Sequence, residues 1–250
     1  MRVYDETIDL DYTATRRFFE QRGEKISTVG ALGAVLYQDR QPDLARRRSD
    51  HEIRTIAPRL RAAGSLQNIL DLGCGTGRWT AAMADVTQQY IGLDFCEDFL
   101  NEASRAAASL PAPARFRYEH ADLSQGLPES VSHTQLNTVI VAGVLLYLND
   151  ADASALLEQI ADRMAPGALL YIREPLGLSN RLTLKEHFST DLDASYSSVY
   201  RAVSEFETML NNTTQRHGLV KQESGPLYPA ELDNRTDTRQ FYFLLRKTSP

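Results

Sequence analysis

A short apolar run that ends in a row of glycines is the feature that most constrains the fold. Residues 68–72 read Asn-Ile-Leu-Asp-Leu, and residues 73–77, Gly-Cys-Gly-Thr-Gly, follow directly. A continuous apolar run of this length, bounded by glycines, is typical of a strand buried in a parallel sheet. Glycines at its end let the chain turn sharply and let a ligand approach the backbone. We therefore predict a strand, a ligand-binding turn and a helix here.

Apolar and amphipathic segments alternate along the chain beyond this turn. Further strands are expected at residues 89–94, 115–119, 138–141, 168–173 and 238–246. Helices are expected at residues 78–86, 97–109, 150–164 and 203–217. Because strands that alternate with helices form parallel sheets with right-handed crossovers, the pattern predicts an α/β fold.

Two stretches fall outside this alternation. Residues 1–64 show helical spacing of apolar residues at 16–22 and 44–60, and we predict a helical cap or lid there. Residues 175–202 are polar and aromatic and do not resemble a core strand, so we predict an insertion that covers the substrate. Residues 65–250 are expected to form one domain that contains this insertion.

Composition and charge exclude several classes of protein. Of the 250 residues 42% are apolar and 24% charged, which is ordinary for a globular domain, and the formal net charge of −6 argues against nucleic acid as partner. Cys74 and Cys96 form no CxxC motif, so neither a disulfide nor a metal site is expected. No apolar run is long enough to span a membrane, and the first residues lack the apolar core of a signal peptide. We expect a cytoplasmic monomer or homodimer.

The glycine turn has more than one interpretation on its residues alone. Dinucleotide enzymes carry G-x-G-x-x-G/A, in which the third small residue lets the helix pack closely on the strand. Here the third glycine comes one position earlier and Arg78 follows it. A turn without a ligand is the other alternative. Asp94 ends the next strand about 20 residues on, where a carboxylate can bind ribose hydroxyls, and this favours a nucleoside cofactor.

Taken together, these features resemble class I S-adenosylmethionine-dependent methyltransferases over most of residues 37–175. The carriers are Asp71 before G-x-G-x-G, Asp94, Ala121-Asp122-Leu123, residues 138–145 as fourth strand and turn, and Arg163-Met164-Ala165-Pro166-Gly167 before the fifth strand. The resemblance implies a Rossmann-like, seven-stranded and mostly parallel sheet with helices on both faces and an antiparallel last strand. It also implies S-adenosyl-L-methionine as cofactor and S-adenosyl-L-homocysteine as product.

The resemblance further implies which side chains contact the cofactor. They are Asp71, Gly73, Gly75, Arg78, Asp94, Phe95, Asp122, Leu123, Ala142 and Tyr37. Asp122 is implied beside the adenine amino group. Arg78 is implied on the methionine carboxylate, which its guanidinium fork suits, or it is a solvated residue at a helix start. Phe95 either packs on the adenine or belongs to the core.

Residues for the methyl acceptor are expected beyond the carboxyl ends of the strands. Glu174 is the candidate to orient or deprotonate the acceptor, with an ion pair to an arginine as its alternative role. Tyr147 and His187 are further catalytic candidates, against a core role for the first and a structural role for the second. The predicted acceptor-binding residues are Arg173, Tyr196, Tyr200 and Tyr12. Tyr196 and Tyr200 are four apart and could share a helical face.

The sequence thus predicts a methyltransferase that transfers a methyl group to N or O of a small molecule, a secondary metabolite, by in-line displacement. A protein or peptide N-methyltransferase is one alternative. Tyr147 and Glu174 occupy positions similar to those of the branch that methylates protein α-amino groups, although that branch has a histidine where Tyr147 stands. A non-catalytic protein that binds S-adenosylmethionine is the other, because methyl transfer needs no signature base.

Overall fold

The structure, a computed structural model, describes residues 1–36, 41–131, 134–190 and 192–248. Its strands are β1 (Arg2–Tyr4), β2 (Gln67–Leu72), β3 (Thr87–Asp94), β4 (Phe116–His120), β5 (Leu136–Ala142), β6 (Met164–Gly177), β7 (Leu182–Ser189), β8 (Ala194–Tyr200), β9 (Leu219–Pro226) and β10 (Thr238–Lys247). Its α-helices are α1 (Tyr12–Glu24), α2 (Ile26–Leu36), α3 (Pro42–Arg61), α4 (Thr80–Met83), α5 (Glu97–Ala107), α6 (Asp150–Arg163) and α7 (Val203–Thr214). None of the helices within these ranges is both long and apolar enough to cross a bilayer.

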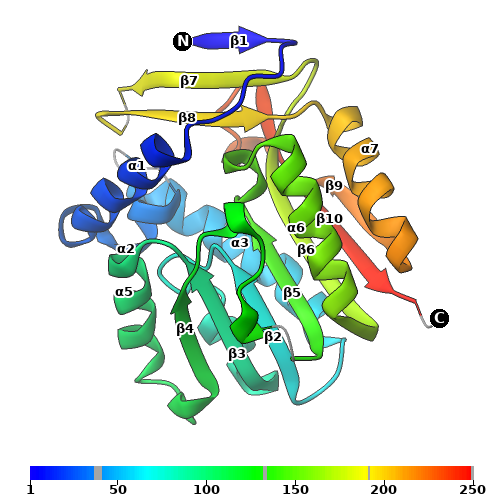
Figure 1. The fold of residues 1–250 in the computed structure, drawn as a ribbon. Helices are drawn as coiled ribbons and strands as arrows, with labels where there is room; N and C mark the ends of the chain where they lie inside the picture. The colour runs from blue at the N-terminus through cyan, green and yellow to red at the C-terminus, as the bar shows by residue number, and fades with distance from the viewer. Residues whose placement is uncertain (37–40, 132–133, 191, 249–250) are drawn as a thin grey trace.

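Seven strands form the central sheet, in the order β4-β3-β2-β5-β6-β10-β9 (Figure 1). The pairs β3–β4, β2–β3, β2–β5 and β5–β6 are parallel, and β10 runs antiparallel between β6 and β9. The prediction of a Rossmann-like, mostly parallel sheet with an antiparallel last strand is therefore confirmed. Strand β9 was not anticipated. The carboxyl ends of five parallel strands consequently meet at one edge.

Both faces of this sheet are buried against helices. Ile69 and Ile140 belong to a core cluster with α3 and α4, whereas Leu70 and Val139 belong to a cluster with α6 and α7. Successive side chains of a strand point to opposite faces, so a strand covered on both sides must be apolar at consecutive positions. This explains why residues 68–72 carry an apolar run.

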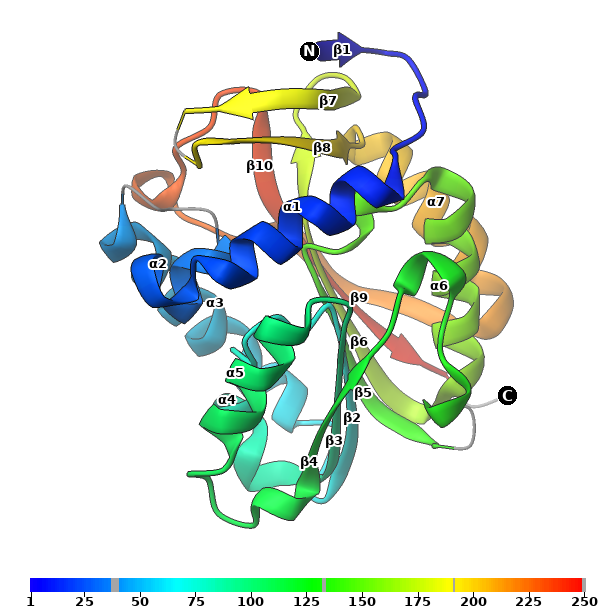
Figure 2. The same ribbon diagram turned by 60° about the vertical axis from the view of Figure 1, so that its left-hand side comes forward.

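A second sheet, in the order β1-β7-β8, lies above the carboxyl edge of the central sheet, with α1 between them (Figures 1 and 2). The aromatic segment predicted as an insertion is therefore a β-hairpin, and β1 adds the third strand by pairing antiparallel with β7. The helical face predicted for Tyr196 and Tyr200 is wrong. Both lie on β8, where an even spacing places side chains on the same face, and their hydroxyl oxygens are 3.3 Å apart.

Candidate active site

Two adjoining cavities open at the carboxyl edge of the parallel strands. The first, called here the helix-side cavity, lies between α1 and the ends of β3, β4 and β5. The second, the hairpin-side cavity, lies between the glycine turn, α3, the segment 228–240 and strand β8 of the hairpin. Both are lined by Phe19, Gly73, Asp94, Gly143 and Tyr147. The two cavities therefore meet at the glycine turn and the loop after β5.

The glycine turn passes very close to that loop. Gly73 has a φ of +61°, and a Cβ on it would lie 2.5 Å from Cγ2 of Val144. A left-handed φ and such a contact both require glycine. Gly75 also has a positive φ, of +53°, and its N–H points at a carboxylate of the next strand. Because these two positions carry no side chain, the turn packs closely against its neighbours and its backbone lines the cavities.

Asp94 ties the turn to the end of β3. Its Oδ2 accepts the N–H of Gly75 and its Oδ1 accepts the N–H of Cys96, each at 2.9 Å. Burial raises the pKa of Asp94. Each carboxylate oxygen has a second lone pair, so the side chain can still accept two hydrogen bonds from a ligand in either cavity.

Asp71 lies inside β2 at the floor of the hairpin-side cavity. Its Oδ2 accepts the hydroxyl proton of Tyr90 at 2.5 Å. Only 1% of the residue is exposed, and burial raises the pKa of its carboxyl group to about 7. Ionisation of Asp71 is therefore disfavoured by its burial, and a cationic ligand beside it would stabilise the ionised form.

Phe95, Asp122 and Leu123, which follow β3 and β4, line the helix-side cavity. Asp122 accepts a hydrogen bond from Nη2 of Arg16 on α1 at 2.6 Å, and it caps the turn of 3-10 helix that follows. Tyr12 of α1, predicted to bind the acceptor, lines this cavity as well and does not line the hairpin-side cavity. Its hydroxyl oxygen accepts the N–H of Asn149 at 2.9 Å.

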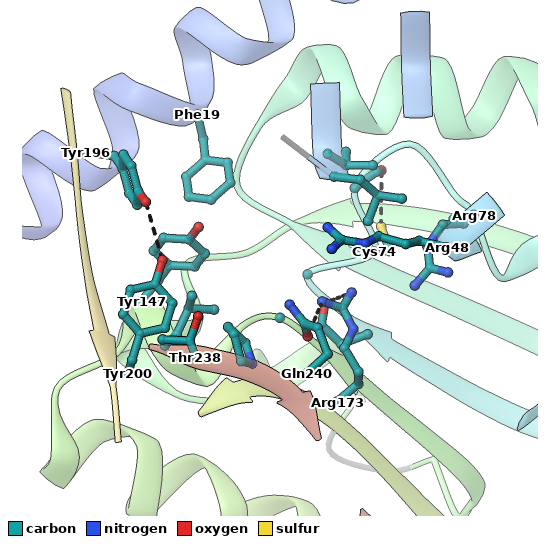
Figure 3. A pocket seen from close by; sticks show the side chains of 18 of the residues that line it. Phe19, Arg48, Cys74, Arg78, Tyr147, Arg173, Tyr196, Tyr200, Thr238 and Gln240 are labelled. Atoms are coloured by element: carbon teal, nitrogen blue, oxygen red, sulfur yellow. Dashed lines mark hydrogen bonds between the residues drawn. The ribbon is translucent and has the colours of Figure 1, made fainter. Parts of the chain in front are cut away.

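Among the residues predicted to bind the cofactor or the acceptor, Arg78, Arg173, Tyr196 and Tyr200 line the hairpin-side cavity (Figure 3). Ala142 lines it as well.

Glu52 of α3 is a buried residue that the sequence analysis missed. Its carboxylate lies 3.0 Å from Nη2 of Arg78 and 3.5 Å from Nε of Arg173, and it accepts a hydrogen bond from the hydroxyl of Tyr171 at 2.8 Å. Burial alone would raise the pKa of Glu52, but the two guanidinium groups lower it. The sequence contained a signal for the burial of Glu52. Arg48, Glu52, Ile56 and Leu60 follow at intervals of four, so Arg48 and Glu52 lie on the same face of α3 as two apolar residues.

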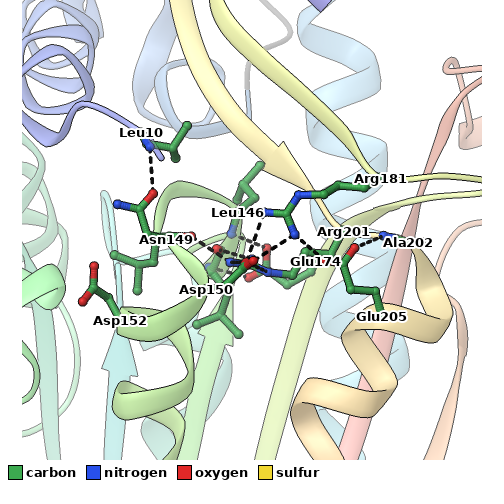
Figure 4. A network of polar contacts seen from close by, with 12 residues as sticks. Leu10, Leu146, Asn149, Asp150, Asp152, Glu174, Arg181, Arg201, Ala202 and Glu205 are labelled. Atoms are coloured by element: carbon green, nitrogen blue, oxygen red, sulfur yellow. Dashed lines mark hydrogen bonds and ion pairs between the residues drawn. The ribbon is translucent and has the colours of Figure 1, made fainter. Parts of the chain in front are cut away.

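Glu174 does not line either cavity among the described residues. It is 1% exposed, and its carboxylate accepts the N–H groups of Val144, Leu145 and Leu146 at 2.9, 2.9 and 3.2 Å (Figure 4). Burial raises its pKa. Arg201 holds the same loop by donating to the carbonyl oxygen of Leu145 at 2.7 Å. Glu174 therefore shapes the loop that both cavities share.

The other catalytic candidates lie in different places. Tyr147 directly follows the three residues whose N–H groups bind Glu174, and it lines both cavities. Its ring packs edge-to-face on Phe19, with ring centroids 4.9 Å apart. His187 lies on β7 in a neighbouring cavity that shares Tyr196 with the hairpin-side cavity, and burial lowers its pKa. Tyr37 falls outside the described residues. The structure thus brings Tyr147 to the junction and leaves His187 at a distance from it.

Comparison with known proteins identifies the central part of the chain. Residues 69–167 match the family model described as a methyltransferase domain. The chain contains a methyltransferase domain. Phosphoethanolamine N-methyltransferase 1 of Triticum aestivum is 28% identical to it over 109 residues, which are 43% of this chain and 21% of that protein. The chain thus spans about a fifth of the length of this curated relative.

Solved structures of methyltransferases share the fold around this domain. Haemonchus contortus phosphoethanolamine N-methyltransferase 1, in complex with phosphoethanolamine and S-adenosylhomocysteine, superposes with a TM-score of 0.67 at 16% identity, over 96% of this chain and 50% of that one. Magnesium protoporphyrin IX methyltransferase of Synechocystis with bound S-adenosylmethionine gives 0.63 at 17%, over 97% and 100%. N-methyltransferase NodS of Bradyrhizobium japonicum with S-adenosylhomocysteine gives 0.61 at 14%, over 94% and 100%. At these identities the likeness shows the class I methyltransferase fold.

Proposed function

We propose that this chain is an S-adenosylmethionine-dependent methyltransferase that acts on N or O of a small molecule. The observation that carries the proposal is that two cavities meet at Gly73, Asp94 and Tyr147, at the carboxyl edge of a methyltransferase domain. One cavity can hold a nucleoside and the other an amino-acid group together with an acceptor. The small sheet and α1 lie over this edge, which favours a small acceptor over a folded protein (Figure 2).

The residues of the helix-side cavity fit the adenosine part of the cofactor. Asp94 keeps lone pairs for the two ribose hydroxyls, and Phe95 and Leu123 offer apolar surface for the base. Asp122 lies where it could accept from the adenine amino group, and its ion pair with Arg16 fixes its position. Tyr12, which lines the same cavity, belongs on this side of the site in the proposal.

The residues of the hairpin-side cavity fit the methionine part. Asp71 can pair with the ammonium group, and Arg78 with the carboxylate. Nη1 of Arg78 is buried and has no hydrogen-bond partner within the described part of the chain, although Nη2 pairs with Glu52. A buried N–H without an acceptor costs about 1–3 kcal/mol. An anionic group of a ligand would remove this cost. Gly73 and Gly75 give the close backbone approach that the cofactor needs.

When bound, the cofactor supplies an electrophilic methyl group on its sulfonium. The chain's own residues position the acceptor and exclude water, which is the main source of catalysis in an in-line displacement. Tyr147 lines the junction of the two cavities, and the hydroxyls of Tyr196 and Tyr200 can orient an acceptor. Glu174 acts as a positioning residue in this scheme, because it holds the backbone that presents Tyr147. His187 lies outside the reacting region.

Calorimetric titration with S-adenosylhomocysteine tests the proposal. The unmodified protein should bind it, and Asp94→Ala should weaken binding by about 1–3 kcal/mol through loss of charge-assisted hydrogen bonds. The matched control is Asp85→Ala, an exposed carboxylate paired with Arg61 away from the cavities, which should bind as the unmodified protein does. Folded protein that binds no S-adenosylhomocysteine would contradict the proposal. Binding without methyl transfer to any acceptor in a broad panel would indicate the non-catalytic alternative.

A further inference from the structure

Arginine is concentrated in the hairpin-side cavity of a chain that is acidic as a whole. Its described lining includes Arg48, Arg78, Arg173, Arg235 and Arg239, against Asp71, Asp94 and Asp233, while the chain has a formal net charge of −6. Arg48 comes from α3, Arg78 from the turn after β2 and Arg173 from β6. Arg235 precedes β10, and Arg239 is the second residue of β10. In Figure 3, Arg48, Arg78 and Arg173 gather on the side of the cavity across from Tyr196 and Phe19.

The two innermost arginines share a single carboxylate. Arg78 and Arg173 lie on either side of Glu52, at 3.0 and 3.5 Å, so one negative charge faces two positive charges in a buried place. Side-chain exposure is 9% for both arginines and 0% for Glu52. Nη1 of Arg78 has no hydrogen-bond partner among the described residues, and Nε of Arg173 has only its ion pair with Glu52. Buried charge is stable only when it is paired. Because one carboxylate is shared by two buried guanidinium groups, these groups can still pair with an anionic group of a ligand.

The position of Arg173 connects it to the reacting region. Its Nη2 donates to the carbonyl oxygen of Ala142, and its Nη1 donates to Oε1 of Gln240, both at 3.2 Å. A Cβ built on Gly143 would lie 3.0 Å from Nη1. Because Gly143 lines both cavities, the guanidinium of Arg173 packs against the junction at which the transferred methyl would lie.

The other arginines of the lining are more exposed than Arg78 and Arg173. The side chain of Arg235 is exposed and makes no hydrogen bond or ion pair with the described residues, whereas Arg239 pairs with Asp233 at 2.7 Å. Arg48 is held by the carbonyl oxygen of Leu232 at 2.7 Å and stacks over the ring of Tyr228. Charge of one sign along a cleft raises the local concentration of ligands of the opposite sign.

We propose that the methyl acceptor carries an anionic carboxylate or phosphate group, which binds to Arg173 and enters past Arg235 and Arg239. This inference rests on the proposed methyltransferase function. Both groups present oxygen pairs that match the guanidinium fork. In this arrangement Arg78 binds the carboxylate of the cofactor. The other arginines of the cavity can then bind the anionic group of the acceptor.

Binding of simple anions to the protein saturated with S-adenosylhomocysteine tests the inference, because the cofactor product then occupies Arg78. Inorganic phosphate and acetate are titrated by calorimetry at constant ionic strength. We expect saturable binding of at least one of them, weakened by about tenfold in Arg235→Gln/Arg239→Gln, with unchanged affinity for S-adenosylhomocysteine. Stronger binding of phosphate than of acetate would assign a phosphate group, and the reverse a carboxylate.

The matched control and a second variant separate the outcomes. Arg105→Gln removes an exposed arginine of α5, paired with Glu102, and should leave anion binding unchanged. Arg173→Gln should abolish anion binding, and the double variant keeps the test decisive if loss of the Glu52 pair unfolds Arg173→Gln. The inference is overturned if the saturated protein binds neither anion, or if the double variant binds as well as Arg105→Gln. Failure of the unmodified protein to bind S-adenosylhomocysteine would instead contradict the proposed function, and the inference would fall with it.

Discussion

The helix-side and hairpin-side cavities meet at one turn, yet the chain builds them in different ways. Apart from α1, the helix-side cavity is lined by Gly73 after β2 and by the segments that follow β3, β4 and β5, within residues 73–148. The hairpin-side cavity draws on α3, β6, β8 and the segment 228–240, which are far apart in the sequence. The cavity that we propose for the adenosine part is thus encoded within one stretch of sequence. The cavity that we propose for the methionine part and the acceptor depends on how distant segments come together.

Substitution of Gly73, in the turn that both cavities share, should have the largest effect on stability and on cofactor binding. In Gly73→Ala the left-handed φ costs about 1–2 kcal/mol, and the contact with Val144 adds about 1–3 kcal/mol of overpacking. Val144 is β-branched and its N–H is held by Glu174, so it cannot move aside easily. Gly167→Ala is the control, because Gly167 has a φ of +83° with nothing within 4 Å of its Cβ. Chemical denaturation and titration with S-adenosylhomocysteine measure both effects.

Gly73→Ala should lose stability beyond its control and should lose cofactor binding, which Gly167→Ala should keep. Equal behaviour of the two variants would show that the turn can relax, and it would weaken the view that both cavities depend on its close packing.

Substitution of Glu174 tests whether this side chain stabilises the loop after β5, which lines both cavities. Glu174→Gln leaves one side-chain oxygen for three N–H groups, and it should lower the free energy of unfolding by about 1–3 kcal/mol. Glu223→Gln is the control. Glu223 is a half-exposed carboxylate on β9 that pairs with Arg59, where about 1 kcal/mol or less is expected. An unchanged stability of Glu174→Gln together with a large loss of turnover would return Glu174 to a catalytic role.

Asp71 gives a smaller effect that is confined to the hairpin-side cavity. Its raised pKa means that the folded protein binds more protons than the unfolded chain between pH 4 and 7, so the contribution of Asp71 to stability is full at low pH and is lost as the pH rises through about 7. In the proposed binding mode the ionised form of Asp71 pairs with the cofactor ammonium, so affinity for S-adenosylhomocysteine should rise by about tenfold from pH 6 to pH 8. Asp71→Asn should lack both trends. A pH-independent affinity in the unmodified protein would show that Asp71 does not face the ammonium group.

The sequence was informative where structure is local. The strand before the glycine turn, the acids at the ends of β2 and β3, and the alternation of strands and helices all follow from patterns within a few residues. These patterns place Phe95, Asp122 and Ala142 at the carboxyl edge, because parallel strands must end there.

What the sequence did not show depends on long-range contacts. Glu174 is a polar residue at the end of a strand, and nothing local indicates that three N–H groups of another loop will surround it. Glu52 sits in a helix expected to form a cap, and its burial follows from the packing of α3 on the central sheet. The hairpin was missed because β7 and β8 carry polar residues and find their partners in each other and in β1.

The pairing of β1 with β7 has a consequence for the order of folding. The amino group of Met1 donates to the carbonyl oxygen of Lys185, 184 residues away along the chain. Contacts of such sequence separation close a very long loop, and they form late unless the intervening chain has already brought the two ends together. We expect β1 to pair with the β7–β8 hairpin last, on a finished methyltransferase domain. By the same reasoning this pairing opens first, at a cost far below that of global unfolding. Amide hydrogens of β1 should therefore exchange well before those of β2.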